Sequence, residues 1–143
     1  MTKAVWLLGG LVAAALTTAP ALAAEVKLAA TLDGASQTGG GDTDGSGTFT
    51  GEIDPDSGDL CYTLTVKDIA VPTMAHIHKG AAGSNGSVVV TLNITGDDGD
   101  ECSALQRDLA KAIVAAPAGY YVNVHNAEFP KGAIRGQLGV VAP

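Results

Sequence analysis

The 143-residue chain has little positive charge and few aromatic side chains. It carries 8 lysine and arginine residues against 15 aspartate and glutamate residues, and aromatic residues make up 4%. A nucleic-acid-binding surface needs clustered basic side chains to neutralise phosphates, so we expect no nucleic-acid partner. The apolar content of 46% is ample for a core, which excludes a disordered acidic chain.

Recognisable catalytic motifs are also missing. The sequence contains no Gly-x-Ser-x-Gly nucleophile motif and no glycine-rich phosphate loop. A pair of glycosidase carboxylates stays open as an alternative, although nothing in the sequence marks a cleft. We therefore expect a non-enzymatic binding or structural role.

Residues 1–23 have the features of a secretory signal peptide. Lys3 supplies the positive end, residues 4–16 are apolar, and Ala21-Leu22-Ala23 is a small-x-small cleavage site. The apolar run is shorter than the ~20 residues of a membrane span. We expect cleavage, export to the periplasm or outside the cell, and no membrane span afterwards; an uncleaved anchor is the alternative. The alanine-rich segment is typical of bacteria.

Only two cysteines occur, Cys61 and Cys102. An even number of cysteines in an exported protein favours a disulfide. The alternative is two buried free thiols.

The rest of the chain, residues 24–143, is predicted to form one domain of short strands. Residues 60–66 alternate in polarity, which indicates a strand, and the turn residues of Asp54–Gly58 predict a hairpin with the strand before it. Helical spacing predicts a helix over residues 103–115, capped by Ser103 and ended by Pro117. The predicted strands cover residues 26–32, 48–53, 60–66, 74–78, 87–94, 120–126 and 133–141. We expect an antiparallel Greek-key β-sandwich of about seven to eight strands with one short helix in a crossover.

Three segments carry a resemblance to a known family. They are Ala75-His76-Ile77-His78-Lys79-Gly80, Tyr120-Tyr121-Val122-Asn123-Val124-His125-Asn126 and Ala133-Ile134-Arg135-Gly136-Gln137-Leu138. In this order they closely resemble the CHRD domain, a module named from chordin and also found in bacterial exported proteins. The resemblance covers roughly residues 25–140. It implies a β-sandwich module and a bacterial exported single-domain member, whose extracellular or periplasmic ligand is unknown.

All three histidines lie within these segments. His76 and His78 are two residues apart, so in a strand they point to the same face, and His125 lies in a separate predicted strand. If the two strands are neighbours, three imidazoles can surround one copper or zinc ion. The His-x-His pair resembles part of Cu,Zn superoxide dismutase. The alternative is that the histidines hydrogen-bond to loops and stabilise the edge of the sandwich.

Three further features are candidates for binding or structural roles. Residues Asp42–Ile53 imitate a calcium-binding EF-hand loop, although the twelfth position is Ile53 instead of glutamate. Arg135 can bind a carboxylate ligand or brace a neighbouring loop through its planar fork. Tyr120 and Tyr121 are predicted to face opposite sides of a strand, one in the core and one exposed.

Overall fold

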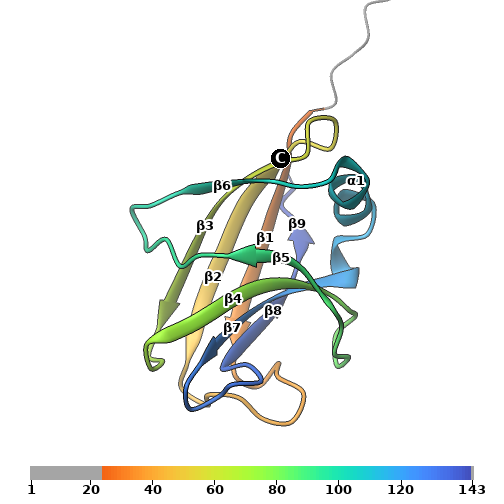
Figure 1. The fold of residues 1–143 in the computed structure, drawn as a ribbon. Helices are drawn as coiled ribbons and strands as arrows, with labels where there is room; N and C mark the ends of the chain where they lie inside the picture. The colour runs from red at the N-terminus through yellow and green to blue at the C-terminus, as the bar shows by residue number, and fades with distance from the viewer. Residues whose placement is uncertain (1–23, 143) are drawn as a thin grey trace, which may run out of the picture.

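The computed structural model describes residues 24–142 of the chain. The predicted signal peptide, residues 1–23, lies outside the described residues. The part that is described contains nine strands, one α-helix and one short 3-10 helix (Figure 1). In chain order these are β1 Val26–Asp33, β2 Ser46–Ile53, β3 Asp59–Lys67, β4 Pro72–Lys79, β5 Val88–Leu92, β6 Glu101–Ala104, α1 Arg107–Ala115, η1 Pro117–Gly119, β7 Tyr120–Asn126, β8 Ile134–Gln137 and β9 Gly139–Val140.

All strand pairs are antiparallel, which confirms the all-β prediction. The strand order is β5-β4-β7-β8-β1-β2-β3-β6, with β9 also paired to β1. The two halves of this path are joined by one residue pair between β1 and β8, Asp33 with Arg135, and by β9. The sheet curls at that junction, so that β4 and β5 cross in front of β1, β2 and β3 (Figure 1).

One hydrophobic core fills the space between the two halves. Leu32, Phe49 and Leu64 line it from one half, and Ile77 and Val122 line it from the other; all five are fully buried. The alternation of buried and exposed residues along β2 and β3 is what places these side chains on a single face. The opposite face of each strand is thereby left for the surface or for covering loops.

The hairpin predicted between β2 and β3 is confirmed, with Phe49 opposite Leu64 in the register. The turn depends on Gly58, whose φ of +92° is unfavourable for a residue with a side chain. Asp54 accepts hydrogen bonds from the backbone N–H of Asp56 and of Ser57, so its carboxylate satisfies the turn locally. Those bonds lower the pKa of Asp54, and the bond from Asp56 is the main cause.

The predicted helix starts too early. Residues 101–104 form strand β6, and α1 begins at Arg107 with Gln106 as its N-cap, so Ser103 is not the cap. Ala110 and Ile113 are the buried residues of the helix and join the core. Within residues 24–142, no helix is long and apolar enough to cross a membrane.

A disulfide joins Cys61 of β3 to Cys102 of β6, and the two residues lie directly opposite each other in the register. This confirms the predicted disulfide. The bond fastens the four-residue edge strand to the sheet and explains why residues 101–104 form a strand instead of a helical turn.

Candidate metal centre

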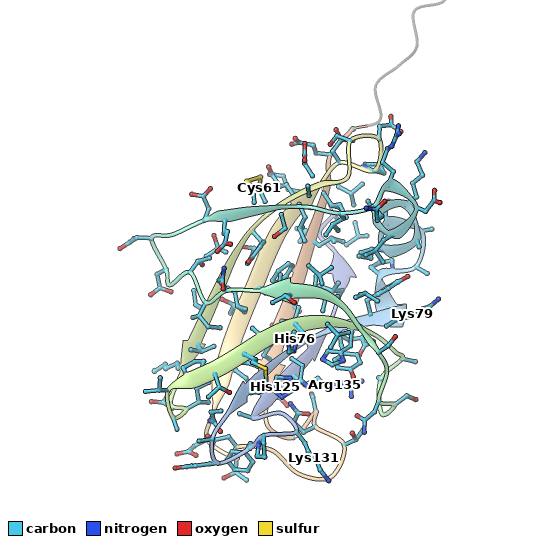
Figure 2. All side chains as sticks on the ribbon, in the orientation of Figure 1. Cys61, His76, Lys79, His125, Lys131 and Arg135 are labelled. Atoms are coloured by element: carbon cyan, nitrogen blue, oxygen red, sulfur yellow. A yellow bond between two sulfur atoms is a disulfide. The ribbon has the colours of Figure 1, made fainter. Side chains whose placement is uncertain are left out.

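The three histidines lie on the outer face of neighbouring strands. His76 and His78 come from β4 and His125 comes from β7, and these two strands are paired. Their neighbours in β4, Ala75 and Ile77, point the other way and belong to the core. The sequence therefore places three imidazoles on one side of the sheet by simple alternation. Figure 2 shows His76, His125 and Arg135 gathered in one region.

The three rings converge. One ring nitrogen from each of His76, His78 and His125 lies within 4.8 Å of the other two. Nδ1 of His76 is 3.4 Å from Nε2 of His125. In residues 24–142 this is the sole group of three or more histidine, cysteine, aspartate or glutamate side chains with such convergence.

Backbone carbonyls fix the orientation of two of these rings. Nδ1 of His78 donates to the carbonyl oxygen of Gly86 at 2.9 Å, and Nδ1 of His125 donates to that of Pro130 at 3.1 Å. A carbonyl oxygen only accepts hydrogen bonds, so the proton of each neutral ring lies on Nδ1 and the lone pair lies on Nε2. Nε2 of His78 is buried and has no hydrogen-bond partner.

Gly86 is required for this arrangement because its backbone lies against the end of β4. A Cβ atom at this position would be 1.6 Å from the carbonyl oxygen of Lys79. No side chain fits there without moving the backbone. Glycine thus lets the loop between β4 and β5 close over His78.

The environment keeps His76 and His125 neutral near pH 7. Burial is the main cause that lowers the pKa of both imidazoles from the ordinary value of 6.5. The neighbouring rings of His125 and His78 lower the pKa of His76 further. For His125, the hydrogen bond with Pro130 opposes the burial effect, and His78 adds to it. A neutral imidazole is the form that binds a metal ion.

The lowered pKa values predict how the stability of the metal-free protein depends on pH. Between the folded-state pKa and 6.5 the unfolded chain binds more protons, so the free energy of unfolding falls as the pH decreases below 6.5. Above 6.5 this contribution is constant. We expect the melting temperature to fall by a few degrees between pH 7 and pH 5, measured by circular dichroism.

The double variant His76→Gln/His125→Gln separates this effect from the protonation of carboxylates. It should lose the part of the pH dependence that the histidines cause and keep the rest. An identical pH dependence in the variant and the original protein would contradict the prediction.

A stacked column stands beside the histidines. The guanidinium of Arg135 lies 3.4 Å from the ring centroid of Tyr121. Tyr121 in turn stacks on His78, with ring centroids 4.8 Å apart and an angle of 7° between the planes. Tyr120 and Tyr121 are both buried, at 4% and 2% exposure, so the prediction that one is exposed is wrong. The loop between β4 and β5 and Arg135 cover the outer face at Tyr121.

Arg135 makes the contacts that a loop brace requires. Its Nη2 donates to the carbonyl oxygens of Ala81 and Ser84 at 3.1 Å and 2.7 Å, and Nη1 donates to Oδ1 of Asn85 at 3.4 Å. The side chain is 1% exposed. A hollow of about 300 Å³ lies next to Arg135 and is lined in part by Gln37. The alternative role of Arg135, binding a carboxylate ligand, stays a prediction.

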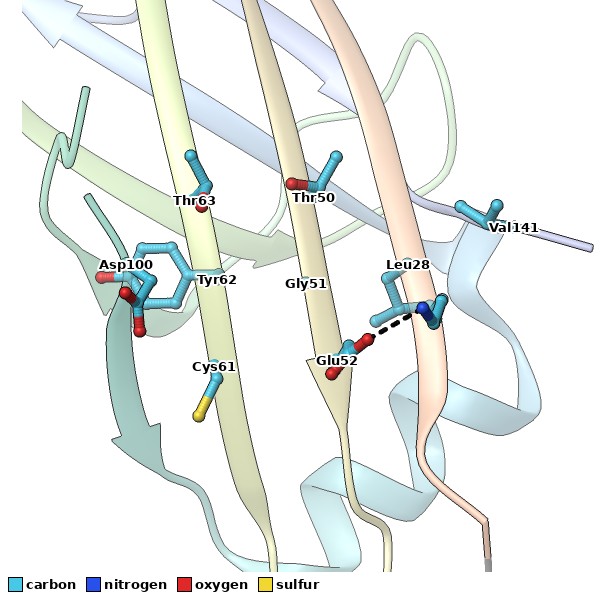
Figure 3. A pocket seen from close by; sticks show the side chains of 10 residues that line it. Leu28, Thr50, Gly51, Glu52, Cys61, Tyr62, Thr63, Asp100 and Val141 are labelled. Atoms are coloured by element: carbon cyan, nitrogen blue, oxygen red, sulfur yellow. Dashed lines mark ion pairs between the residues drawn. The ribbon is translucent and has the colours of Figure 1, made fainter. Parts of the chain in front are cut away.

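A second hollow lies over β1, β2 and β3, away from the histidines (Figure 3). Its volume is about 430 Å³. It contains two carboxylates, Glu52 and Asp100, and both residues are exposed. Glu52 forms an ion pair with Lys27 at 3.0 Å. The general acid of a glycosidase is a more buried carboxyl group than that of Glu52 or Asp100.

The EF-hand-like segment does not form a calcium-binding loop. Residues 46–53, which include its last ligand positions, are strand β2, whereas an EF-hand needs all twelve residues in one loop. Asp42 is buried, and its pKa is raised mainly by that burial and also by the nearby carboxylate of Asp44. The carboxylate thus belongs to a crowded turn instead of a ring of calcium ligands.

Sequence reasoning identified the three histidines but missed the groups that surround them. Tyr121 was considered only as a core or exposed residue, and Gly86 and Pro130 were given no role at the site, because their roles depend on which loops fold over the outer face. One signal was available for Tyr121. It lies two strand alternations from His125, so it shares the face of that histidine.

The fold and the site together define a class: an all-β module of the sandwich type, with a disulfide at one edge and a three-histidine cluster on its outer face. The CHRD domain family model matches residues 28–138, and the chain belongs to the CHRD domain family. No curated protein matches the chain, and no solved structure matches it.

Proposed function

We propose that this CHRD module is an exported, non-enzymatic binding protein that holds a copper or zinc ion between His76, His78 and His125. The observation that carries the proposal is the buried Nε2 of His78, which has no partner, on a histidine that belongs to the converging group. A buried polar atom without a partner costs ~1–3 kcal/mol. A metal ion bound to this nitrogen would remove that cost.

The spacing of the nitrogens supports a single ion. Ligand bonds of ~2.0–2.1 Å around one zinc ion place neighbouring nitrogens roughly 3.3–3.6 Å apart. His76 and His125 already have this separation, at 3.4 Å. The three nitrogens lie within 4.8 Å of one another, so side-chain shifts of about an ångström would bring them to the separation that one ion requires.

The hydrogen-bond partners of the histidines support the same proposal. Histidines that bind metals usually donate their other ring N–H to a carbonyl or carboxylate, which fixes the ring. His78 and His125 do so with Gly86 and Pro130. Three imidazoles without a carboxylate suit copper or zinc, whereas calcium and magnesium prefer oxygen ligands.

Export is part of the proposal. The signal-like residues 1–23 and the disulfide favour an oxidising compartment outside the cytoplasm. A copper or zinc site with three protein ligands also leaves a coordination position open. The unknown ligand of the module would then bind there or to the loops around the site.

The test is a titration of the metal-free protein with Zn²⁺ in which the heat of binding is measured by calorimetry. We expect one ion per chain and at least a roughly 100-fold loss of affinity in His78→Ala, since a ligand is removed. The chain has three histidines in all, so each imidazole signal in an NMR spectrum reports on this site. All three signals should shift with the same stoichiometry.

Thr73→Ala is the matched control, because Thr73 is exposed on the same strand and offers no metal-binding nitrogen. It should bind zinc as the original protein does. Zinc binding that is unchanged in His78→Ala would overturn the proposal and leave the histidines as structural residues.

A further inference from the structure

Met74 lies on the same face as the three histidines. It is two residues before His76 in β4, and it is directly opposite His125 in the register with β7. Side chains directly opposite each other in an antiparallel pair have Cβ atoms ~4.5–5.5 Å apart. The side chain of Met74 therefore begins next to the space between His76 and His125.

The core does not explain this methionine. Met74 is 52% exposed, and it is one of the few large apolar side chains at the surface of the described chain. Its flexible side chain has three rotatable bonds, so the sulfur can turn toward the histidines without moving the backbone. This side of the cluster is also the accessible one, because His76 is only half-buried whereas His78 and His125 are buried.

We propose that Met74 is the fourth ligand of the site and that it makes the site selective for copper, with copper(I) favoured. This inference rests on the proposed metal-binding function. A thioether is a soft donor that selects copper(I) and adds little to the binding of Zn²⁺. Three imidazoles and one thioether form a four-donor set for copper(I). The sulfur would then occupy the position that three imidazoles leave open, and the unknown ligand of the module would bind to the loops around the site.

The experiment compares two metals in one variant. Met74→Leu keeps the size of the side chain and removes the sulfur. Copper(I) is supplied as its acetonitrile complex without a thiol reductant, so the disulfide stays intact, and its affinity is measured by competition with bicinchoninate. Zn²⁺ affinity is measured by calorimetry. Val71→Ala is the control, since Val71 is a nearby exposed apolar residue without a donor atom.

We expect Met74→Leu to bind copper(I) at least roughly tenfold more weakly and to bind Zn²⁺ within about threefold of the original protein. X-ray absorption should show a sulfur ligand in the copper(I) form of the original protein and none in Met74→Leu. Val71→Ala should change neither affinity.

The other outcomes separate this inference from the proposed function. Equal copper(I) affinity in Met74→Leu and the original protein overturns the role of Met74 and leaves the three-histidine site standing. An equal loss for both metals also overturns it, because the variant then acts on the structure of the site. If the original protein binds neither metal, both the inference and the proposed function fail.

Discussion

An Arg135→Met variant is expected to lose about 3 kcal/mol of the free energy of unfolding and to melt roughly 10 °C lower. The methionine fills a similar volume but cannot donate hydrogen bonds. The carbonyl oxygens of Ala81 and Ser84 then lose their shared donor, and Tyr121 loses the guanidinium stacked on its ring. Circular dichroism during heating and urea titration measure both quantities.

Two variants serve as controls for Arg135→Met. Arg135→Lys keeps the positive charge but lacks the planar fork that stacks on a ring and donates to two acceptors at once, so it should recover only part of the stability. Arg107→Met removes the other arginine, which is exposed on α1, and should change the stability by at most ~0.5 kcal/mol.

Hydrogen exchange shows where the stability is lost. The backbone N–H of Gly86 donates to the hydroxyl of Tyr121 at 3.2 Å, and this bond depends on the loop that Arg135 holds. In Arg135→Met the amide of Gly86 should exchange faster, while the amides of β2 and β3 change only with global stability. Unchanged melting and unchanged exchange at Gly86 would show that Arg135 does not brace the loop.

Most of the strands could be predicted because their signals are local. The alternation of residues 60–66 reports which side chains face the core, and strand β3 is found at Asp59–Lys67. The segment from Tyr120 to Asn126 is found at the predicted bounds for the same reason. Alternation of polarity depends only on the two-residue period of a strand, so it can be recognised without knowing which strands pair with it.

The helix start could not be predicted, because local and tertiary signals disagree there. Ser103 has the side chain of a good N-cap, but Cys102 is bonded to Cys61, and residues 101–104 pair with β3. A distant covalent bond thus overrides the local preference. The last predicted strand, residues 133–141, divides into β8 and β9, because its first half pairs with β7 and its second half pairs with β1.

The site could be predicted only in part. The shared face of His76 and His78 follows from their spacing. The position of His125 depends on the pairing of β4 with β7, which are far apart in sequence, and no local pattern specifies that register. The carbonyls of Gly86 and Pro130 carry no sequence signal at all, since every residue has a carbonyl group.

The second large effect is expected when the disulfide is removed. The double variant Cys61→Ala/Cys102→Ala should lose about 4 kcal/mol of the free energy of unfolding, because the bond closes a long loop with a sequence separation of 41 and restricts the unfolded chain. Both cysteines are exposed, so the loss of buried side-chain area adds little. Urea denaturation gives the free energy.

The loss should also be visible in the structure at one edge. Strand β6 has four residues and pairs only with β3 among the described strands, so without the bond its amides should exchange nearly as fast as those of a loop. The slope of the urea transition should rise, because the unfolded chain without the cross-link exposes more surface. The original protein after reduction is the control and should match the double variant. Thiol titration of the unfolded, unreduced original protein should find no free thiols. Two free thiols, or an unchanged urea midpoint in the double variant, would contradict this account of the edge strand.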